Sequence, residues 1–483
     1  MKIKASFYMS KNEKIIFFLI ILLAIFLRFY HLAEYPLPGE TADEYKYFWI
    51  GHSLLHYGSP IGWSWLESYP PGSREVTHYL SDKYKLAMTN VSIEPQTDLP
   101  IKTQVELTVL LYQNHKYPMV NADFDSPPFY SILLGLFDFI FFKNDMFDFS
   151  FFSIRLFSVI LSLISLIVLY FLVRELISYK VALISALFYA TEPIIVLTNR
   201  LVVTENLLIL LMLLSLFFIN KYFKTNRKIF FYIASITAGL AAFTKVAGVS
   251  VIIILTLILF YRKQWREGFY AGIIGASIFS LYFVYGAIFD WNTFLKVLLE
   301  QGDRLQFSVR TMILGSIMGN VVSKSFLSEF ILFSWLAIFV SRNKKNNTEL
   351  LLYMFLSYFL FLVLIVGNFQ YSWYKIPLYS FFCVFSALLL VDIGERKSLI
   401  KYLVIMFLFV MIPSVWFFDL VPYTFAKWAF RFFLIFFIVL YWVLSKLSSN
   451  YYKLTIFSIF GFHIIINILT ILLLNTTYYK LFI

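Results

Sequence analysis

The chain has 483 residues, of which 60% are hydrophobic, 21% aromatic and only 14% charged, with a formal net charge of +12. This composition excludes a water-soluble globular domain, because such domains are about half apolar and a quarter charged. The single cysteine, Cys383, excludes a disulfide framework and a cysteine-based metal site. Apolar runs of about 18 or more residues recur along the chain, each long enough to cross a ~30 Å hydrocarbon core. The sequence therefore predicts an all-α polytopic membrane protein.

The first apolar run begins at Ile15 and extends to about Tyr30. Lysines precede it at Lys2, Lys4, Lys11 and Lys14. By the positive-inside rule, these lysines place the N-terminus in the cytoplasm. The run lacks a small-x-small cleavage site, so we interpret it as a retained signal-anchor helix that leads outward.

A long polar stretch follows and reaches Pro128. We predict that residues 31–152 form an extracytoplasmic first loop. Within this loop we expect residues 128–142 to form an interfacial helix on the outer leaflet, interrupted at Asp138, rather than a spanning helix.

Further apolar spans lie near 153–173, 181–198, 202–220, 229–244, 246–261, 268–287, 325–340, 350–367, 376–391, 400–418, 427–445 and 454–474. Basic clusters fall on every second connection: Arg174/Lys180, Lys221/Lys224/Arg227/Lys228, Arg262/Lys263/Arg266, Arg342/Lys344/Lys345, Arg396/Lys397/Lys401 and Lys446/Lys453. One orientation, with these clusters cytoplasmic, satisfies the whole chain. The excess charge therefore sets topology and meets anionic lipid headgroups rather than nucleic acid.

With the first helix, these spans give about 13 transmembrane helices in one domain, residues 1–483, with the C-terminus outside. Charged residues cluster at the ends of the spans, and His463, mid-helix in the last span, is the main exception. A histidine there is expected to bond a neighbouring helix.

Two adjacent acids, Asp43 and Glu44, stand just after the first span. One interpretation is structural: Thr41-Ala42-Asp43-Glu44 fits a capping box, and acids are favoured in a first helical turn. The residues that follow at helical spacing would then lay the helix on the membrane surface: Tyr45, Phe48, Trp49, His52 and Leu55. Asp43 faces about 100° away from Glu44 and remains free for a ligand.

The other interpretation is general-base catalysis. A carboxylate at the outer boundary of the membrane, its basicity raised by partial desolvation, suits transfer between a lipid-borne donor and a water-borne acceptor.

An ordered series of short motifs extends along the chain: Arg28, Pro36, Asp43-Glu44-Tyr45, Gly51, Tyr57-Gly58, Asp125-Ser126-Pro127-Pro128-Phe129-Tyr130, Arg155-Leu156-Phe157-Ser158, Glu192-Pro193, Arg200, Glu205, Gly239-Leu240, Lys245, Tyr285-Gly286, Asp290-Trp291 and Trp373-Tyr374. This series resembles the GT-C superfamily of membrane glycosyltransferases. The likeness is to the protein O-mannosyltransferases and the lipid A aminoarabinose transferases, and it covers nearly the whole transmembrane region.

The resemblance implies an inverting transfer of a sugar from dolichyl- or undecaprenyl-phosphate on the extracytoplasmic side. It also implies that Asp43 is the base or acceptor-binding group, with Glu44 beside it. The acceptor would be a protein, lipid or glycan, and the membrane a prokaryotic plasma membrane.

Three features depart from the family pattern. The familiar His-Pro-Pro is Ser126-Pro127-Pro128 here, so Asp125 is the candidate to substitute for the histidine. An acid that is often Asp in the fourth helix is Glu205. Residues 61–120 are an insertion, which we interpret as acceptor-recognition apparatus or a lid.

A phosphate leaving group requires cations. Lys245 lies in a tight outer turn between two spans, where it either snorkels to the interface or binds phosphate. Arg200 and Arg155 are also expected at outer helix ends, where a guanidinium binds phosphate bidentately. Further candidates for substrate binding are Tyr45, Asp125, Glu205, Asp290, Arg304 and Tyr374, although Asp290 also suits a helix cap.

We expect neither a cofactor nor a bound metal. Asp43, Glu44 and Asp125 would gather a divalent ion only if the first loop folds back. Two other functions remain open: a ligase or polymerase that uses polyprenyl-pyrophosphate-linked glycans, and a transporter or flippase of lipid-linked sugars.

Overall fold

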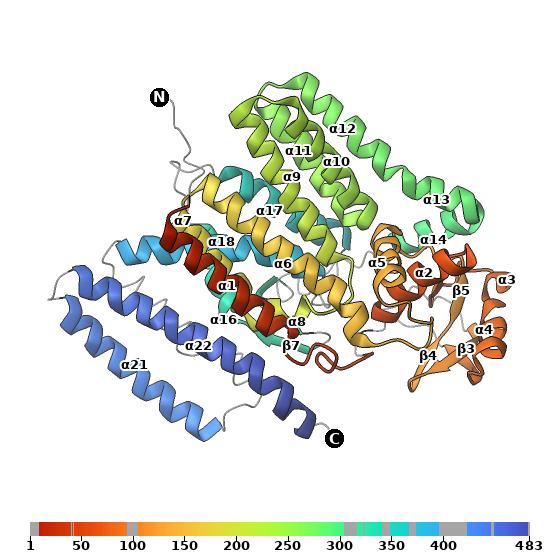
Figure 1. The fold of residues 1–483 in the computed structure, drawn as a ribbon, viewed down its shortest axis with the longest axis horizontal. Coiled ribbons are helices and arrows are strands. Elements are labelled where there is room, and N and C mark those ends of the chain that lie inside the picture. Colours follow the sequence, from red (N-terminus) through yellow and green to blue (C-terminus); the bar gives the residue numbers. More distant parts are fainter. Residues whose placement is uncertain are drawn as a thin grey trace.

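The computed structural model describes residues 9–39, 41, 43–93, 105–303, 316–321, 324–340, 348–366, 373–395, 423–445 and 449–481. Most of the described chain is a helical bundle (Figure 1). Its elements are α1 (Lys11–Phe29), α6 (Phe151–Leu176), α7 (Tyr179–Thr191), α8 (Pro193–Thr198), α9 (Glu205–Thr225), α10 (Lys228–Thr244), η1 (Val246–Gly248), α11 (Val249–Tyr261), α12 (Trp265–Phe279), α16 (Glu329–Val340), α17 (Glu349–Phe361), η2 (Leu362–Val366), η3 (Trp373–Lys375), α18 (Ile376–Glu395), α21 (Tyr423–Ser445) and α22 (Ser449–Leu481).

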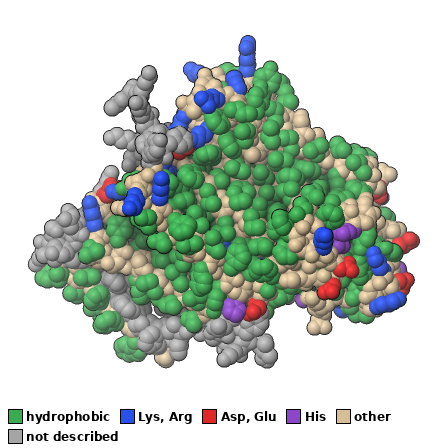
Figure 2. Space-filling view, viewed as in Figure 1, with side chains coloured by type: hydrophobic (Ala, Val, Ile, Leu, Met, Phe, Trp, Pro, Cys, Tyr) green, Lys and Arg blue, Asp and Glu red, His purple; other side chains and the backbone are tan. Residues whose placement is uncertain are grey.

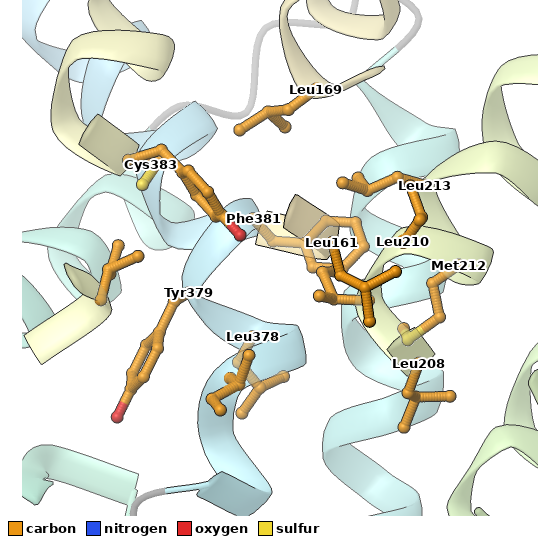
Figure 3. Packing of buried hydrophobic residues seen from close by; sticks show 14 of the residues in the cluster. Leu161, Leu169, Leu208, Leu210, Met212, Leu213, Leu378, Tyr379, Phe381 and Cys383 are labelled. Atoms are coloured by element: carbon orange, nitrogen blue, oxygen red, sulfur yellow. The ribbon is translucent and has the colours of Figure 1, made fainter. Parts of the chain in front are cut away.

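The centre of the bundle is formed where α6, α9 and α18 meet. Figure 3 shows Leu161 of α6, Met212 of α9 and Phe381 of α18 among the packed side chains. Met212 and Phe381 are fully buried. The outside of the bundle is also apolar, and hydrophobic side chains cover much of the face in Figure 2. A helix set that is hydrophobic all round is typical of a membrane domain.

Five helical segments of the described chain are long and apolar enough to cross a membrane: Phe151–Leu176, Glu205–Thr225, Trp265–Phe289, Trp373–Glu395 and Tyr452–Leu473. Six shorter apolar helices accompany them: Phe129–Phe141, Tyr179–Thr191, Lys228–Thr244, Val246–Tyr261, Glu329–Phe339 and Glu349–Leu364. These segments support a membrane protein. The predicted number of about 13 spans stays a prediction, and the apolar span expected near 400–418 lies outside the described residues.

Beside the bundle lies a second group of elements, which we call the outer lobe (orange and red at the right of Figure 1). It comprises α2 (Asp43–Tyr57), β1 (Ile61–Trp63), α3 (Pro71–Arg74), α4 (Val76–Tyr84), β2 (Met88–Ile93), β3 (Val105–Tyr112), β4 (His115–Tyr117), β5 (Met119–Asn121) and α5 (Phe129–Phe141).

The chain is mostly helical, as predicted, but it also contains short antiparallel sheets that the all-α prediction did not include. In the outer lobe β1 pairs antiparallel with β5, and β2, β3 and β4 form an antiparallel sheet. A further hairpin joins β6 (Met318–Val321) to β7 (Lys324–Leu327). The strands are short and lie within an otherwise helical chain, so the apolar pattern did not distinguish them.

Helix α2 does not present its apolar stripe to a membrane surface, which corrects the prediction. Tyr45 and Trp49 are fully buried and pack their rings on Tyr112 and Tyr117 of the sheet. Phe48 is buried as well, whereas Leu55 near the end of the helix is exposed. The inserted residues therefore supply a core for α2, which argues against a detached lid.

Helix α5 has the short length expected for an interfacial helix, and its place at a membrane surface stays a prediction. Its 13 residues span roughly 20 Å, too short for a ~30 Å hydrocarbon core. It exposes Phe139, Ile140 and Phe141 while its opposite face packs on α2. Asp138 does not interrupt it, because this side chain is buried and accepts a hydrogen bond from the Asn144 amide at 2.5 Å.

A third group connects the bundle to the outer lobe. Helices α13 (Leu281–Phe289) and α14 (Trp291–Asp303) follow α12 and reach over the lobe (Figure 1). Phe294 and Val297 of α14 are fully buried against Leu66 and Phe124 of the lobe. We call α13 and α14 together the arm.

Candidate active site

The candidate site lies where α2 faces the bundle. Asp43 is the first residue of α2 and is partly exposed. Among the residues that the structure describes, its carboxylate has no hydrogen-bond or ion-pair partner. Desolvation raises the pKa of Asp43, and the nearby Lys46 and Lys245 partly oppose this rise. Asp43 is therefore an available carboxylate with raised basicity near two ammonium groups.

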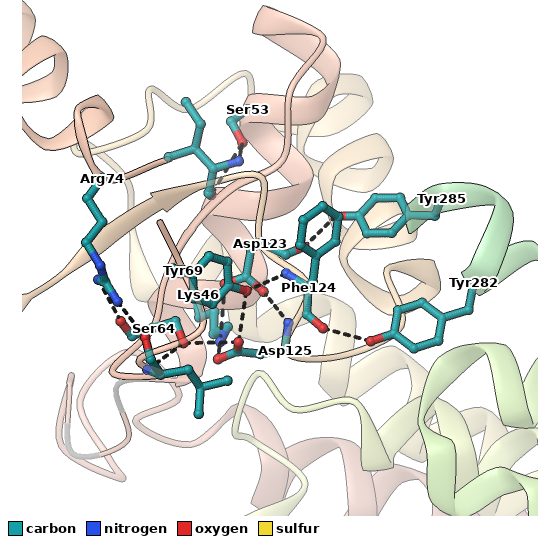
Figure 4. A network of polar contacts seen from close by, with 12 residues as sticks. Lys46, Ser53, Ser64, Tyr69, Arg74, Asp123, Phe124, Asp125, Tyr282 and Tyr285 are labelled. Carbon is teal, nitrogen blue, oxygen red and sulfur yellow. Dashed lines mark hydrogen bonds and ion pairs between the residues drawn. The ribbon is translucent and has the colours of Figure 1, made fainter. Parts of the chain in front are cut away.

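Lys46 forms the first of two ion-paired groups beside Asp43. It lies one helical turn after Asp43, so both side chains project from the same face of α2. Its Nζ is 3.2 Å from Oδ2 of Asp123 and 2.5 Å from Oδ2 of Asp125 (Figure 4). The other Asp125 oxygen accepts hydrogen bonds from the hydroxyls of Ser64 and Tyr69, each at 3.0 Å. Burial raises the pKa of Asp123 to about 7, against the attraction of Lys46.

Lys245 forms the second group. It ends α10 in an extended conformation, in the predicted tight turn before α11. Its ammonium pairs with the Glu205 carboxylate and lies 4.0 Å from the centroid of the Tyr374 ring. Glu205 is the first residue of α9 and is fully buried. Tyr47 of α2 links the two groups, because its hydroxyl contacts the Thr204 side chain and lies near Asp43 and Glu205.

Glu44 has a different role from the expected one. Its carboxylate is fully buried and receives Nε and Nη2 of Arg155 at 2.9 and 2.8 Å. It also accepts the backbone N–H of Val202 at 3.1 Å. Because both oxygens are engaged with Arg155 or the backbone, this side chain supports neither the capping box nor a catalytic role.

Arg155 and Arg200 are not available as phosphate ligands, which corrects that prediction. Both side chains are completely buried. Arg155 also donates to the carbonyls of Leu32 and Pro36, at 3.0 and 2.7 Å. Arg200 donates to the carbonyls of Tyr35 and Leu27, at 2.9 and 2.6 Å. The two guanidiniums instead fasten the segment between α1 and α2 onto the bundle.

Three other candidates also lie away from Asp43 or outside the described chain. The Tyr45 hydroxyl donates to Gln113 Oε1 at 2.6 Å, inside the aromatic core of the outer lobe. Asp290 caps α14 by accepting the N–H groups of Asn292 and Thr293, each at 3.1 Å, so the capping interpretation applies. Arg304 lies outside the described residues.

The acidic groups do not gather for a metal. No set of three His, Cys, Asp or Glu residues that could hold a metal ion occurs in the described part of the chain. The proposed set of Asp43, Glu44 and Asp125 is separated because Glu44 turns toward Arg155 while Asp125 binds Lys46. In the bundle, Nε2 of His463 lies 2.8 Å from Oε1 of Glu192. This contact confirms that His463 bonds a neighbouring part of the bundle.

The residues that sequence reasoning missed are Lys46, Asp123 and Tyr47. Lys46 was detectable from its i, i+3 spacing to Asp43. Asp123 was detectable from the spacing of Asp123 and Asp125, since alternate residues of an extended chain point to one side. The role of Tyr47 depends on the approach of α2 to α9, which no local pattern reveals.

Comparison with solved structures identifies proteins of similar fold. The structure is similar to that of ArnT from Cupriavidus metallidurans bound to undecaprenyl phosphate, with a TM-score of 0.53 and 13% sequence identity over 96% of this chain and 78% of that one. The apo state of the same protein gives a TM-score of 0.51 and 13% identity over 95% and 77% of the two chains. The chain has the fold of ArnT. The likeness that the motifs indicate is therefore supported at the level of the fold.

A family model described as dolichyl-phosphate-mannose-protein mannosyltransferase matches residues 125–289. The matched segment begins at Asp125 and includes Glu205 and Lys245, but it ends before η3 and excludes Asp43. No curated protein matches the sequence.

Proposed function

We propose that the chain is a membrane glycosyltransferase that moves a sugar from a polyprenyl-phosphate donor to a protein, lipid or glycan acceptor at the outer face of a prokaryotic plasma membrane. The observation that carries the proposal is the environment of Asp43. A partly exposed carboxylate without a partner in the described chain lies near two lysines, and each lysine is paired with a buried acid, Asp123 or Glu205.

The reaction would be a single inverting displacement. The acceptor hydroxyl or amine attacks the anomeric carbon of the donor sugar while Asp43 removes the acceptor proton. The bond between the anomeric carbon and the phosphate oxygen breaks, and polyprenyl phosphate leaves with the bonding electrons. A carboxylate is suited to this role because desolvation raises its pKa toward the working range.

The developing phosphate charge requires a cation, and Lys245 is the best placed one. Its ammonium has three N–H donors, and the pairing with Glu205 leaves donors for a phosphate oxygen. The side chain is 17% exposed, unlike the buried Arg155 and Arg200. Lys46 supplies a second positive charge near Asp43. Positioned charges of this kind stabilise a leaving group most effectively where water is excluded.

The comparisons support the same class of donor. The structure of ArnT holds undecaprenyl phosphate, and the matching family model is named for dolichyl-phosphate-mannose. Both names describe a sugar carrier that combines an isoprenoid chain with one phosphate.

The proposal is tested by donor turnover in liposomes that contain the purified protein. Polyprenyl-phosphate sugars are supplied one at a time with membrane extract as acceptor, and released polyprenyl phosphate is measured. Release from at least one monophosphate donor is expected. No release from these donors, together with release of polyprenyl pyrophosphate when pyrophosphate-linked glycans are supplied instead, would indicate the ligase or polymerase. Movement of the lipid-linked sugar across the bilayer without bond cleavage would indicate a transporter.

A further inference from the structure

The segment 123–125 carries the two acids that pair with Lys46, and its backbone is hydrogen-bonded by three tyrosines (Figure 4). The Tyr285 hydroxyl donates to the carbonyl of Asp123 and the Tyr282 hydroxyl donates to the carbonyl of Phe124, each at 2.7 Å. From the other side, the Tyr69 hydroxyl accepts the N–H of Phe124 at 2.7 Å. The Phe124 backbone is thus fixed at both of its polar groups.

These backbone hydrogen bonds determine the direction of the Asp123 and Asp125 side chains. Asp123 and Asp125 are separated by one residue in non-helical backbone, so their side chains project to one side, where Lys46 lies. Phe124 projects to the other side and packs edge-on against Tyr285 and Phe294, with ring centroids 5.7 Å apart in both pairs. A rotation of this segment would withdraw the carboxylates from Lys46.

The tyrosines that bind the carbonyls come from the arm, far away in sequence. Tyr282 and Tyr285 lie one turn apart on α13 and are 2% and 7% exposed. The arm also holds the lobe through Glu300, whose carboxylate accepts the N–H groups of Glu67 and Ser68 at 3.1 and 2.9 Å. That short loop continues to Tyr69, so the arm fixes the third tyrosine as well.

Buried hydroxyls at this place need an explanation, because phenylalanine would fill the same volume without a polar group to satisfy. We propose that Tyr282 and Tyr285 are positioning residues: through the carbonyls of residues 123 and 124 they keep both carboxylates on Lys46, and so keep Lys46 beside Asp43. The catalytic consequence rests on the proposed function, whereas the effect on Lys46 does not.

The direct test is the chemical reactivity of Lys46. The purified protein is treated with an acetylating N-hydroxysuccinimide ester, and modification of each lysine is followed by mass spectrometry. The double variant Tyr282→Phe/Tyr285→Phe keeps both rings and loses both hydrogen bonds. We expect Lys46 to be acetylated on the order of tenfold faster in this variant, because two buried hydrogen bonds no longer hold its partners.

Lys245 is the internal control, because its partner Glu205 is not held by the arm, and its acetylation rate should not change. Tyr170→Phe removes another buried tyrosine hydroxyl, one bonded to Glu13, and should leave both lysines unchanged. The single variants are milder and should give intermediate rates. Unchanged reactivity of Lys46, or an equal rise at Lys245, would overturn the proposal.

Donor turnover supplies a second readout. The double variant is expected to lower kcat about tenfold with the donor KM unchanged, and to have no further effect when Lys46 is already Met. Independent, additive losses in that double-mutant cycle would show that the tyrosines act only on stability. If wild type turns over no donor, the proposed function fails, while the acetylation of Lys46 still decides this inference.

Discussion

Two adjacent acids of α2 have opposite environments. Successive helical residues project about 100° apart, and that angle directs Glu44 into the bundle and Asp43 toward the site. Glu44 meets Arg155 in a pair with no exposure on either side chain. Asp43 remains partly exposed, with two lysines near enough to lower its pKa and two acids near enough to raise it. Neighbouring charges therefore adjust the basicity of Asp43 without binding it directly.

The pH dependence of turnover should respond to those neighbours in opposite directions. Lys46→Met removes a positive charge that lowers the pKa of Asp43, so the acid limb of the rate profile should move to higher pH. Asp125→Asn removes a negative charge that raises this pKa, so the limb should move to lower pH. Initial rates measured between pH 4 and pH 8 check both shifts. Two shifts of the same sign would contradict this electrostatic account.

We expect the ion pair between Glu44 and Arg155 to stabilise the folded protein. Glu44→Gln leaves the guanidinium buried without its counter-ion, and the free energy of unfolding should fall by about 3–5 kcal/mol. Glu75→Gln, at an exposed position of the outer lobe, is the matched control and should change it by less than about 0.5 kcal/mol. Thermal unfolding in detergent measures both. A Glu44→Gln protein as stable as the control would show that the ion pair is dispensable.

At the scale of elements, the contact of α2 with α5 fixes the position of α2 within the lobe. The two helices approach backbone to backbone at Gly51 and Gly135. A Cβ atom added at Gly51 would lie 2.0 Å from the carbonyl oxygen of Ser131. The position therefore requires glycine, and α2 can pack this closely on α5 only because the side chain is absent.

Gly51→Ala should accordingly force α2 away from α5 and destabilise the protein by about 1–3 kcal/mol, as overpacking does. Donor turnover should fall too, because α2 carries Asp43 and Lys46. Gly72→Ala is the control: a Cβ atom there would meet nothing within 4 Å. Equal melting temperatures and rates for the two variants would mean that the helices separate without consequence.

The elements also show what sequence patterns can and cannot predict. The short length of α5 and the tight turn at Lys245 follow from local apolar runs, so both were predicted. The apolar stripe of α2 does not distinguish a lipid surface from a protein core, because both select the same apolar side chains. The sheet that covers this stripe belongs to the inserted residues, and the burial of Arg155 and Arg200 depends on carbonyls distant in sequence. Such partners appear only when the chain is folded.

At the scale of the whole molecule, charge separates the two ends of the bundle. One end carries exposed basic residues from several helices: Lys180, Lys224, Arg227, Lys228, Arg262, Lys263 and Arg266. Contacts of Glu13 with Arg174, Glu175 with Lys221, and Lys228 with Glu267 join the same helix ends. Glu205 and Lys245 lie at the opposite ends of α9 and α10, near Asp43. Figure 2 shows charged side chains at the rim of the bundle and on the lobe.

This separation predicts a testable orientation. Cys383 is buried, so single cysteines can be introduced at exposed positions in a Cys383→Ser background. In intact cells, a membrane-impermeant maleimide should label Asp82→Cys on the lobe and leave Lys263→Cys unlabelled until the membrane is permeabilised. Both positions are exposed, so accessibility within the protein is matched. The reverse labelling pattern would place the lobe in the cytoplasm and rule out an extracytoplasmic reaction.

In the proposed reaction, Asp43 removes the acceptor proton near two lysines that are held by acids. The rate of polyprenyl phosphate release by the Asp43→Asn protein tests this role, with wild type and the exposed lobe variant Asp82→Asn measured beside it. We expect a loss of at least about a hundredfold for Asp43→Asn, with donor binding and melting temperature retained, and a wild-type rate for Asp82→Asn. Release by Asp43→Asn at the wild-type rate would show that Asp43 is not the base.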